Sequence, residues 1–245
     1  MTKKQATSCI YDTLYGGNKT TCMKGGAMSE SDILSLLIDK KNFMLKVFAT
    51  LITQLGITYY IMTNYDREKD KDKRIPKTWV LVVASFAVIL LLALVPMNIY
   101  LKFGLFTLFS GITGLLFSEL MRITNPKLVQ MAVVGTLGIF TTFFVLGAGL
   151  LFSGIKLGLR TGLFLLFSLL LLIVAMIVSY FTGEYGNSYR LLSGIGLILF
   201  SAFIVYDTNK ILQKDYYGDF VTASLDYYLD IINIFIRLLS YNRQR

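Results

Sequence analysis

The sequence predicts an all-α polytopic membrane protein with six to seven transmembrane helices. The first observation is composition: the mean hydropathy is +0.62, 55% of the residues are hydrophobic and 16% are charged. Soluble domains carry roughly 25% charged residues. The second is patterning, because after residue 42 the charged residues concentrate in short gaps between long apolar runs. These runs approach the ~20 residues that a helix needs to cross the hydrocarbon core of a bilayer.

An amino-terminal tail, residues 1–42, precedes the first apolar run. Two pairs of glycines among polar residues predict that most of this tail is mobile. Ser29 and Asp32 then have the spacing of a helix start, and the apolar residues of 33–38 predict a short amphipathic helix before the membrane. The remaining residues, 43–245, are predicted to form a single membrane domain.

Six apolar runs are predicted to be transmembrane helices, and a seventh segment is shorter and more polar. The six runs are residues 43–62, 79–97, 103–120, 129–152, 161–180 and 191–208, and the seventh segment is 222–241. Small residues recur inside the runs, and in membranes they let helix backbones approach closely. We therefore expect the runs to pack into one bundle.

The charge balance predicts membrane lipids, and not nucleic acid, as the partner. The net charge is +9, from 24 Lys and Arg against 15 Asp and Glu. In a soluble protein this excess would suggest nucleic acid, but here the basic residues flank apolar runs, where they face lipid headgroups. The positive-inside rule favours a cytosolic amino terminus if the last segment re-enters, and the count is nearly even if it spans. Both possibilities stay open.

Two aspartates, Asp207 and Asp230, lie inside apolar helices. An ionised carboxylate near the middle of a bilayer costs about 2.5–3.5 kcal/mol on insertion scales. A chain keeps such groups when they pair, titrate or contact an ion. Asp207 lies near the predicted end of its run, so a capping or headgroup-level aspartate is the alternative interpretation.

The last segment carries a polar stripe. As a helix, it places Asp226, Asp230, Asn233 and Arg237 on one face, at i, i+4, i+7 and i+11. Apolar residues cover the other faces, which favours a buried helix whose stripe faces other helices or water. A helix lying on the membrane surface is the rival interpretation, but it would carry a wider polar face.

We expect Asp207 to meet Asp230 between the sixth and seventh helices. Two close carboxylates cannot both ionise cheaply, so a shared proton would bridge them. Loss of that proton, or gain of a cation, would separate the two helices and act as a pH-sensitive gate. Carboxylates are also hard ligands of the kind that Ca²⁺ uses. Glu184, just after the fifth run, is either a cation-recruiting acid at the mouth or an ordinary loop acid.

These residues resemble a known family. Tyr206-Asp207-Thr208, preceded by Ser193-Gly194, is similar to the sixth helix of the Bax inhibitor-1 (TMBIM, or lifeguard) membrane proteins. Residues 223–225 and 228–235 resemble the final helix of that family closely. Within the family, the chain looks nearest the Golgi anti-apoptotic (lifeguard 4) branch, including its viral members.

The resemblance implies a specific fold and activity. The family fold has six helices wrapped around a central carboxyl-terminal helix. The implied activity is a pH-sensitive calcium leak of an internal membrane, Golgi or endoplasmic reticulum, that lowers store calcium and suppresses cell death. Ca²⁺ would be the permeant ion, protons would gate the leak through Asp207 and Asp230, and no cofactor is implied. Cell-death proteins or calcium-channel proteins of the membrane are the implied protein partners.

The chain departs from the family pattern in two places. Asp226 occupies a position that usually holds Asn, Ser or Ala, so its carboxylate is an addition. Some members hold the aspartate pair closed with an arginine from helix two, but residues 79–100 contain no basic residue. Arg237 and Lys46 are the substitutes that the sequence offers.

Two other classes of function were weighed against the leak. A non-enzyme is predicted, because the chain has no histidine and so no Ser-His dyad or HExxH metal site. An intramembrane aspartyl protease also needs two membrane aspartates, but its GxGD motif is incomplete at Tyr216-Tyr217-Gly218-Asp219. A non-conducting membrane scaffold that regulates apoptosis stays open, since one fold can serve both roles.

Overall fold

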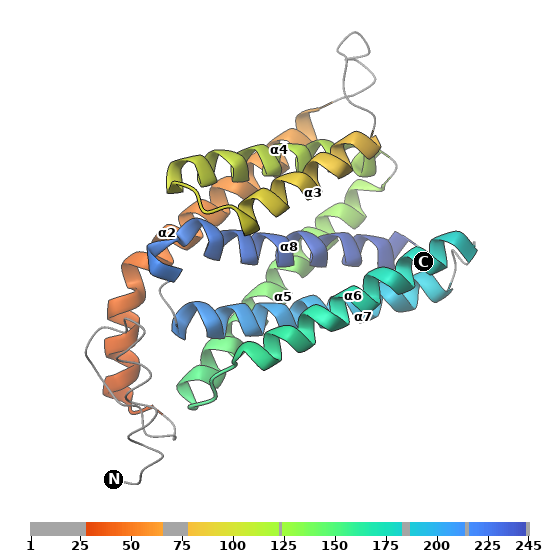
Figure 1. Ribbon diagram of the computed structural model, residues 1–245. Helices are drawn as coiled ribbons and strands as arrows, with labels where there is room; N and C mark the ends of the chain where they lie inside the picture. Colours follow the sequence, from red (N-terminus) through yellow and green to blue (C-terminus); the bar gives the residue numbers. More distant parts are fainter. Residues whose placement is uncertain (1–27, 66–77, 123, 183–186, 214–215, 244–245) are drawn as a thin grey trace.

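The computed structural model describes residues 28–65, 78–122, 124–182, 187–213 and 216–243 (Figure 1). These residues form seven α-helices and one 3-10 turn. They are α2 (Glu30–Asn64), α3 (Thr78–Leu94), α4 (Ile99–Arg122), α5 (Pro126–Phe152), α6 (Leu159–Thr182), α7 (Asn187–Gln213), η1 (Tyr216–Gly218) and α8 (Phe220–Arg243). Among them, α2, α4, α5, α6 and α7 are long and apolar enough to cross a membrane, and α3 is a shorter apolar helix. The predicted all-α polytopic membrane fold is confirmed.

The first helix begins where the sequence predicts. The Ser29 side chain accepts a hydrogen bond from the Asp32 backbone at 3.2 Å, and the Asp32 carboxylate accepts one from the Ser29 backbone at 3.3 Å. This reciprocal pair is a capping box. The helix then continues without a break to Asn64, because no glycine or proline interrupts residues 30–55. The predicted amphipathic segment and the first span are therefore one helix of 35 residues.

Two predicted helix ends differ from the structure. The second run was expected to reach residue 97, but α3 ends at Leu94. Pro96 explains this, since a proline disfavours helical backbone in the residue before it. The sixth run was expected to end at residue 208, but α7 continues to Gln213. Asp207 therefore lies more than a turn inside α7.

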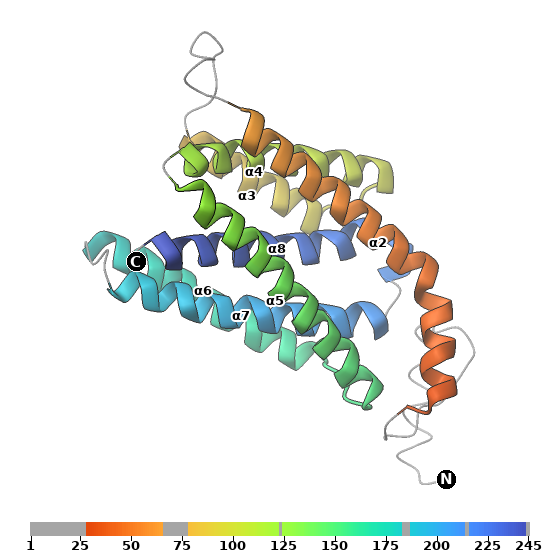
Figure 2. The same ribbon diagram turned by 180° about the vertical axis from the view of Figure 1, so that it is seen from behind.

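The last helix occupies the centre of the bundle (Figures 1 and 2). It packs against α2, α4, α5 and α7, whereas α3 packs mainly on α4 and α6 mainly on α7. Tyr227, Tyr228 and Ile234 of α8 are fully buried. α8 has 24 residues without interruption, about 36 Å at 1.5 Å per residue. This length is sufficient to cross a hydrocarbon core of about 30 Å, but α8 is not among the five helices of the described residues that are both long and apolar enough to cross a membrane.

Close helix contacts explain some of the glycines inside the spans. A Cβ atom added to Gly147 of α5 would lie 2.6 Å from the Val205 carbonyl oxygen of α7. A Cβ atom on Gly114 of α4 would lie 2.8 Å from Cβ of Ile61 in α2. At Gly149, by contrast, nothing lies within 4 Å of such an atom. The small-residue prediction is thus confirmed for Gly114 and Gly147 and does not extend to Gly149.

The start of α8 is fixed to the start of α4. Asp219 caps α8 by accepting the Thr222 backbone N–H at 2.9 Å, and Lys102 of α4 donates to the same carboxylate at 2.5 Å. Burial alone would raise the pKa of Asp219, but the hydrogen bonds from Lys102 and Thr222 outweigh it and lower the pKa. The acid of the incomplete protease motif therefore serves as a helix cap.

Candidate functional site

Asp207 and Asp230 meet between α7 and α8, as the sequence predicts. Their exposed fractions are 7% and 4%, and their carboxyl groups lie within hydrogen-bonding reach of each other. A short connection joins α7 to α8, so a residue near the end of one helix faces a residue in the first half of the next. The Asp207 carboxyl group is buried against α8 and not exposed at a helix end, while its depth in the membrane stays a prediction.

The protonation state of the pair decides whether its two carboxyl groups can form a hydrogen bond. A carboxylate offers only acceptors, so two carboxyl groups can hydrogen-bond to each other only when one of them carries a proton. Oδ2 of Asp230 is buried and has no hydrogen-bond partner among the described residues. Beside the pair, the Tyr227 hydroxyl donates to Oγ1 of Thr208 at 3.0 Å. The site is therefore a buried pair of carboxyl groups with a hydroxyl contact beside it.

A third acid, Asp226, lies one helical turn before Asp230 and is bound by two donors. Nζ of Lys210 lies 3.1 Å from its Oδ2, and the Tyr216 hydroxyl donates to the same oxygen at 2.9 Å. The Lys210 Nζ is also 3.9 Å from Oδ1 of Asp207 and 4.8 Å from the centre of the Tyr216 ring. Lys210 therefore bridges the acid from α8 and the acid from α7.

Lys210 is not singled out in the sequence analysis, although its i, i+3 spacing from Asp207 places the two on one helix face. The two expected substitutes for a helix-two arginine lie elsewhere. Lys46 is 5.9 Å from the ring centre of Phe220, and Arg237 donates to Sδ of Met176 at 2.7 Å.

The remaining predicted residues are placed as follows. Asn233 turns back on its own helix and donates to the Leu229 carbonyl at 2.7 Å. Arg237 faces α7, where a Cβ atom on Gly196 would lie 2.9 Å from its Nε. Glu184 lies outside the described residues. The stripe on α8 is therefore split between the acid cluster and a separate arginine contact.

The acids do not form a closed metal cage. Among the described residues, no group of three or more His, Cys, Asp or Glu side chains could hold a metal ion. Ca²⁺ takes six to eight oxygen ligands, and Asp207 and Asp230 supply only two carboxylates. Ca²⁺ ligation by this pair stays a prediction.

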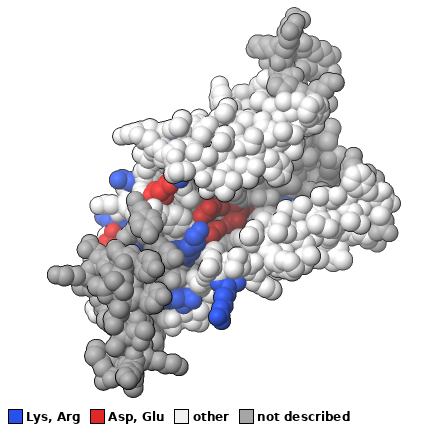
Figure 3. Space-filling model, in the orientation of Figure 1, with Lys and Arg blue, Asp and Glu red and all other residues white. Residues whose placement is uncertain are grey.

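The acid cluster faces a hollow in the molecular surface. Figure 3 shows acidic side chains gathered between the layer of α3 and α4 and the layer of α6 and α7, with basic side chains at the edge. The side chain of Asp226 is 24% exposed, whereas that of Asp207 is 10% exposed. Exposure therefore falls from Asp226 to Asp207.

Asn209 fixes the connection between α5 and α6 beside the site. Its amide nitrogen donates to the Gly147 and Ile155 carbonyls at 3.3 and 3.0 Å, and its oxygen accepts the Leu157 N–H at 2.8 Å. Gln213 donates to the same Asn209 oxygen. Two residues after Asp207, the chain therefore anchors α7 to its neighbours.

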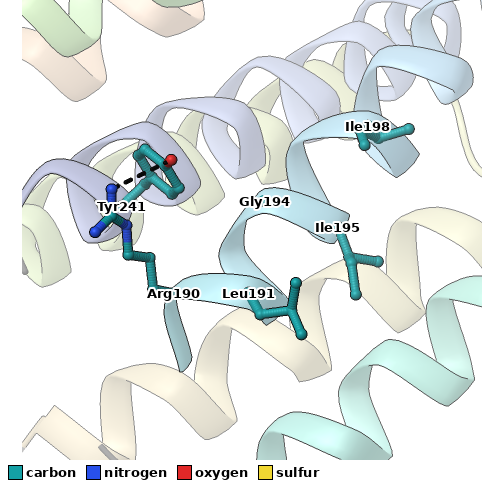
Figure 4. A pocket seen from close by; sticks show the side chains of 6 residues that line it. All are labelled: Arg190, Leu191, Gly194, Ile195, Ile198 and Tyr241. Carbon is teal, nitrogen blue, oxygen red and sulfur yellow. Dashed lines mark hydrogen bonds between the residues drawn. The ribbon is translucent and has the colours of Figure 1, made fainter. Parts of the chain in front are cut away.

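A pocket lies at the start of α7, the end of the helix away from Asp207 (Figure 4). It has a volume of about 470 Å³, and Arg190 and Tyr241 line it. Arg190 donates to the Tyr241 hydroxyl at 3.4 Å and lies 4.7 Å from the centre of its ring. Arg190 precedes Asp207 by 17 residues of continuous helix, about 26 Å, so this contact joins helix ends away from the aspartate pair.

Comparison with known proteins places this fold and site in a family. The family model described as "Inhibitor of apoptosis-promoting Bax1" matches residues 40–245. Bax inhibitor 1 of Schizosaccharomyces pombe is 28% identical over 208 residues, which cover 80% of this chain and 74% of that protein.

Two further relatives carry names that the resemblance anticipated. Protein lifeguard 4 of Mus musculus is 29% identical over 148 residues, 60% of this chain and 58% of that protein. The Golgi anti-apoptotic protein of Vaccinia virus (strain Lister) is 34% identical over 146 residues, 59% of this chain and 57% of that protein. The matches thus span little more than half of these two proteins. The family match covers every helix that builds the aspartate site, and the chain belongs to the Bax inhibitor-1 family.

Proposed function

We propose that this protein is a pH-sensitive leak for Ca²⁺ across an internal membrane, gated by the Asp207–Asp230 pair. The observation that carries the proposal is the burial of two facing carboxyl groups between α7 and α8. Carboxylates of this kind inside a membrane bundle mark ion pathways and proton relays. The hollow over the acid cluster supports a route toward the pair.

The gate would work through the shared proton. With one proton on the pair, a hydrogen bond joins α7 to α8. Without it, two negative charges face each other in a medium of low dielectric constant, where their repulsion is strong. The other titratable or charged groups around the pair are Lys210 of α7, Asp226 and Tyr227 of α8, and Tyr216 of η1. Deprotonation of the pair is expected to loosen the interface and admit a cation.

The proposed setting is an internal membrane with a cytosolic amino terminus. The described ends of α4, α6 and α7 that carry Lys102, Arg160 and Lys210 lie on the same side of the bundle as the start of α2 (Figure 1). The positive-inside rule supports a cytosolic location for that side if α8 re-enters, because the basic residues are nearly balanced if α8 spans. The name of the viral relative supports the Golgi as the compartment.

The test is Ca²⁺ flux through the purified protein in liposomes across a range of pH. Wild type should pass Ca²⁺ in a pH-dependent manner, and Asp207→Asn and Asp230→Asn should each alter that dependence. Asp39→Asn, which removes an exposed acid of α2, is the control and should keep the wild-type profile. A wild-type flux that does not change with pH, or identical profiles in both pair variants and wild type, would overturn the proposal.

A non-conducting scaffold is the second candidate, and the names of the relatives favour it, because they refer to apoptosis. In this case the protein would suppress cell death by binding other cell-death or calcium-channel proteins of the membrane. Survival of cells expressing Asp207→Asn separates the candidates. A scaffold should protect cells although the flux response is altered, whereas protection by a leak should change together with flux.

A further inference from the structure

We infer that Lys210 is a tethered cation that restricts the access of divalent ions to the aspartate pair, and that Asp226 and Tyr216 position it there. This inference deepens the proposed leak and rests on it. It assigns the residue that restricts access to the aspartate pair, and it gives Asp226 a role.

The contacts of Lys210 place its charge between the acids. Its Nζ is 3.1 Å from Asp226 Oδ2 and 3.9 Å from Asp207 Oδ1. Both carboxylates face an ammonium group that can donate three hydrogen bonds. A Ca²⁺ ion that bound Asp226 Oδ2 or Asp207 Oδ1 would meet the positive charge of the ammonium group at close range, so the two cations would repel each other there.

The charge of the cluster supports this role of Lys210. The three acids, Asp207, Asp226 and Asp230, carry two negative charges when the buried pair shares one proton. Lys210 reduces this to one negative charge. Without the ammonium group, two negative charges would face the hollow, and these match the charge of a divalent cation. The lysine therefore lowers the attraction of the cluster for such an ion.

The exposure of the side chains places Lys210 at the mouth. The exposed fractions of the Lys210, Asp226 and Asp207 side chains are 33%, 24% and 10%. Exposure thus falls from the lysine toward the buried pair. By this order, a cation that approaches from solvent meets the Lys210–Asp226 contact before it reaches Asp207.

Tyr216 holds this contact from outside the helices. Its φ angle is 48°, in the left-handed region that residues other than glycine seldom adopt. The turn directs the hydroxyl to Asp226 at 2.9 Å and places the ring 4.8 Å from Lys210 Nζ. Burial and then the charges of Asp226 and Asp207 raise the pKa of Tyr216, so its hydroxyl keeps the proton that it donates.

The experiment measures Ca²⁺ flux in proteoliposomes at fixed pH over a range of Ca²⁺ concentrations. Lys210→Met removes the charge and keeps most of the volume. It should raise flux at low Ca²⁺ by roughly tenfold and lower the half-saturating concentration, because loss of a charged contact is typically equivalent to a tenfold change or more. Lys210→Arg keeps the charge and should raise flux less than Lys210→Met does. Lys210→Gln replaces Lys210→Met if the latter does not fold.

A double variant tests whether Asp226 positions the lysine. In an Asp226→Asn background, Lys210→Met should change flux at least threefold less than it does alone, because the contact is already lost. Equal effects in both backgrounds would overturn the role given to Asp226. If Lys210→Arg raised Ca²⁺ flux as much as Lys210→Met, the role given to the charge of Lys210 would be overturned.

The two proposals can fail separately. Absence of pH-dependent flux in wild type overturns the leak and this inference with it. A pH profile that responds to Asp207→Asn, combined with wild-type flux and wild-type half-saturation in Lys210→Met, overturns only the role of Lys210.

Discussion

Gly147→Ala tests whether the contact between α5 and α7 is as close as the structure indicates. The added Cβ would lie 2.6 Å from the Val205 carbonyl oxygen and 2.9 Å from Cβ of Thr208. Ordinary van der Waals contact begins near 3.4 Å, so one helix would have to move by about 0.8 Å, the difference between 3.4 and 2.6 Å. The oxygen belongs to the backbone of α7, and no side-chain rotation can relieve the contact.

The expected cost follows from two opposed effects. Overpacking a close contact typically costs about 1–3 kcal/mol, while replacing a helical glycine by alanine gains up to about 1 kcal/mol. Gly149→Ala is the matched control, because it lies two residues away on the same helix and has open space around it. Gly149→Ala should show only the gain in stability that comes from replacing a helical glycine. The two variants should therefore differ by about 1–3 kcal/mol, with Gly147→Ala the less stable.

Thermal unfolding in detergent measures this difference. For a chain of this size, 1 kcal/mol corresponds to about 2–4 °C in Tm, so Gly147→Ala should melt roughly 2–12 °C below Gly149→Ala. Thr208 follows Asp207 directly, so the same displacement should also disturb the pH profile of Ca²⁺ flux. Equal melting temperatures for the two variants would refute the claimed helix contact.

Two further predictions concern polar groups that hold helix ends. The lowered pKa of Asp219 means that its carboxylate stabilises the fold above its ordinary pKa near 3.8, and that this contribution disappears as the pH falls through the lower folded value. Asp219→Asn should therefore lower Tm at pH 7 and have a smaller effect in acid, and an effect independent of pH would contradict this. Asn209→Leu should cost about 1–3 kcal/mol or more, since it removes the partners of the Ile155 and Leu157 backbone groups. Asn233→Leu, which breaks only a contact within α8, is its control in the same melting experiment, and equal losses would contradict the special role of Asn209.

The sequence predicts the helices well because the membrane sets their length. A span needs about 20 apolar residues whatever its neighbours are, so the runs could be located without knowledge of the fold. The polar stripe on the last segment likewise predicts burial, and α8 is central. Asp207 and Asp230 could be paired because the helices that carry them are adjacent in the chain.

The rest depends on how helices cross, which a single sequence does not specify. Gly147 and Gly149 are equivalent as sequence, but only Gly147 lies where α5 crosses α7. Lys210 was overlooked because it lies near the end of an apolar run, where a lysine usually faces headgroups. The surroundings of Lys210 also depend on η1, whose Tyr216 ring centre lies 4.8 Å from Lys210 Nζ.

Asp226 and Lys210 each offset the energetic cost of placing the other in this site. Asp226 alone would place a third acid beside a pair that already excludes a second charge, and repulsion would destabilise the cluster. Lys210 alone would bring an ammonium group into a largely apolar helix. Together they form a contact of 3.1 Å that offsets both costs. The acid and the base therefore form one contact between α7 and α8, whereas α3, the helix after the first span, contains no basic residue.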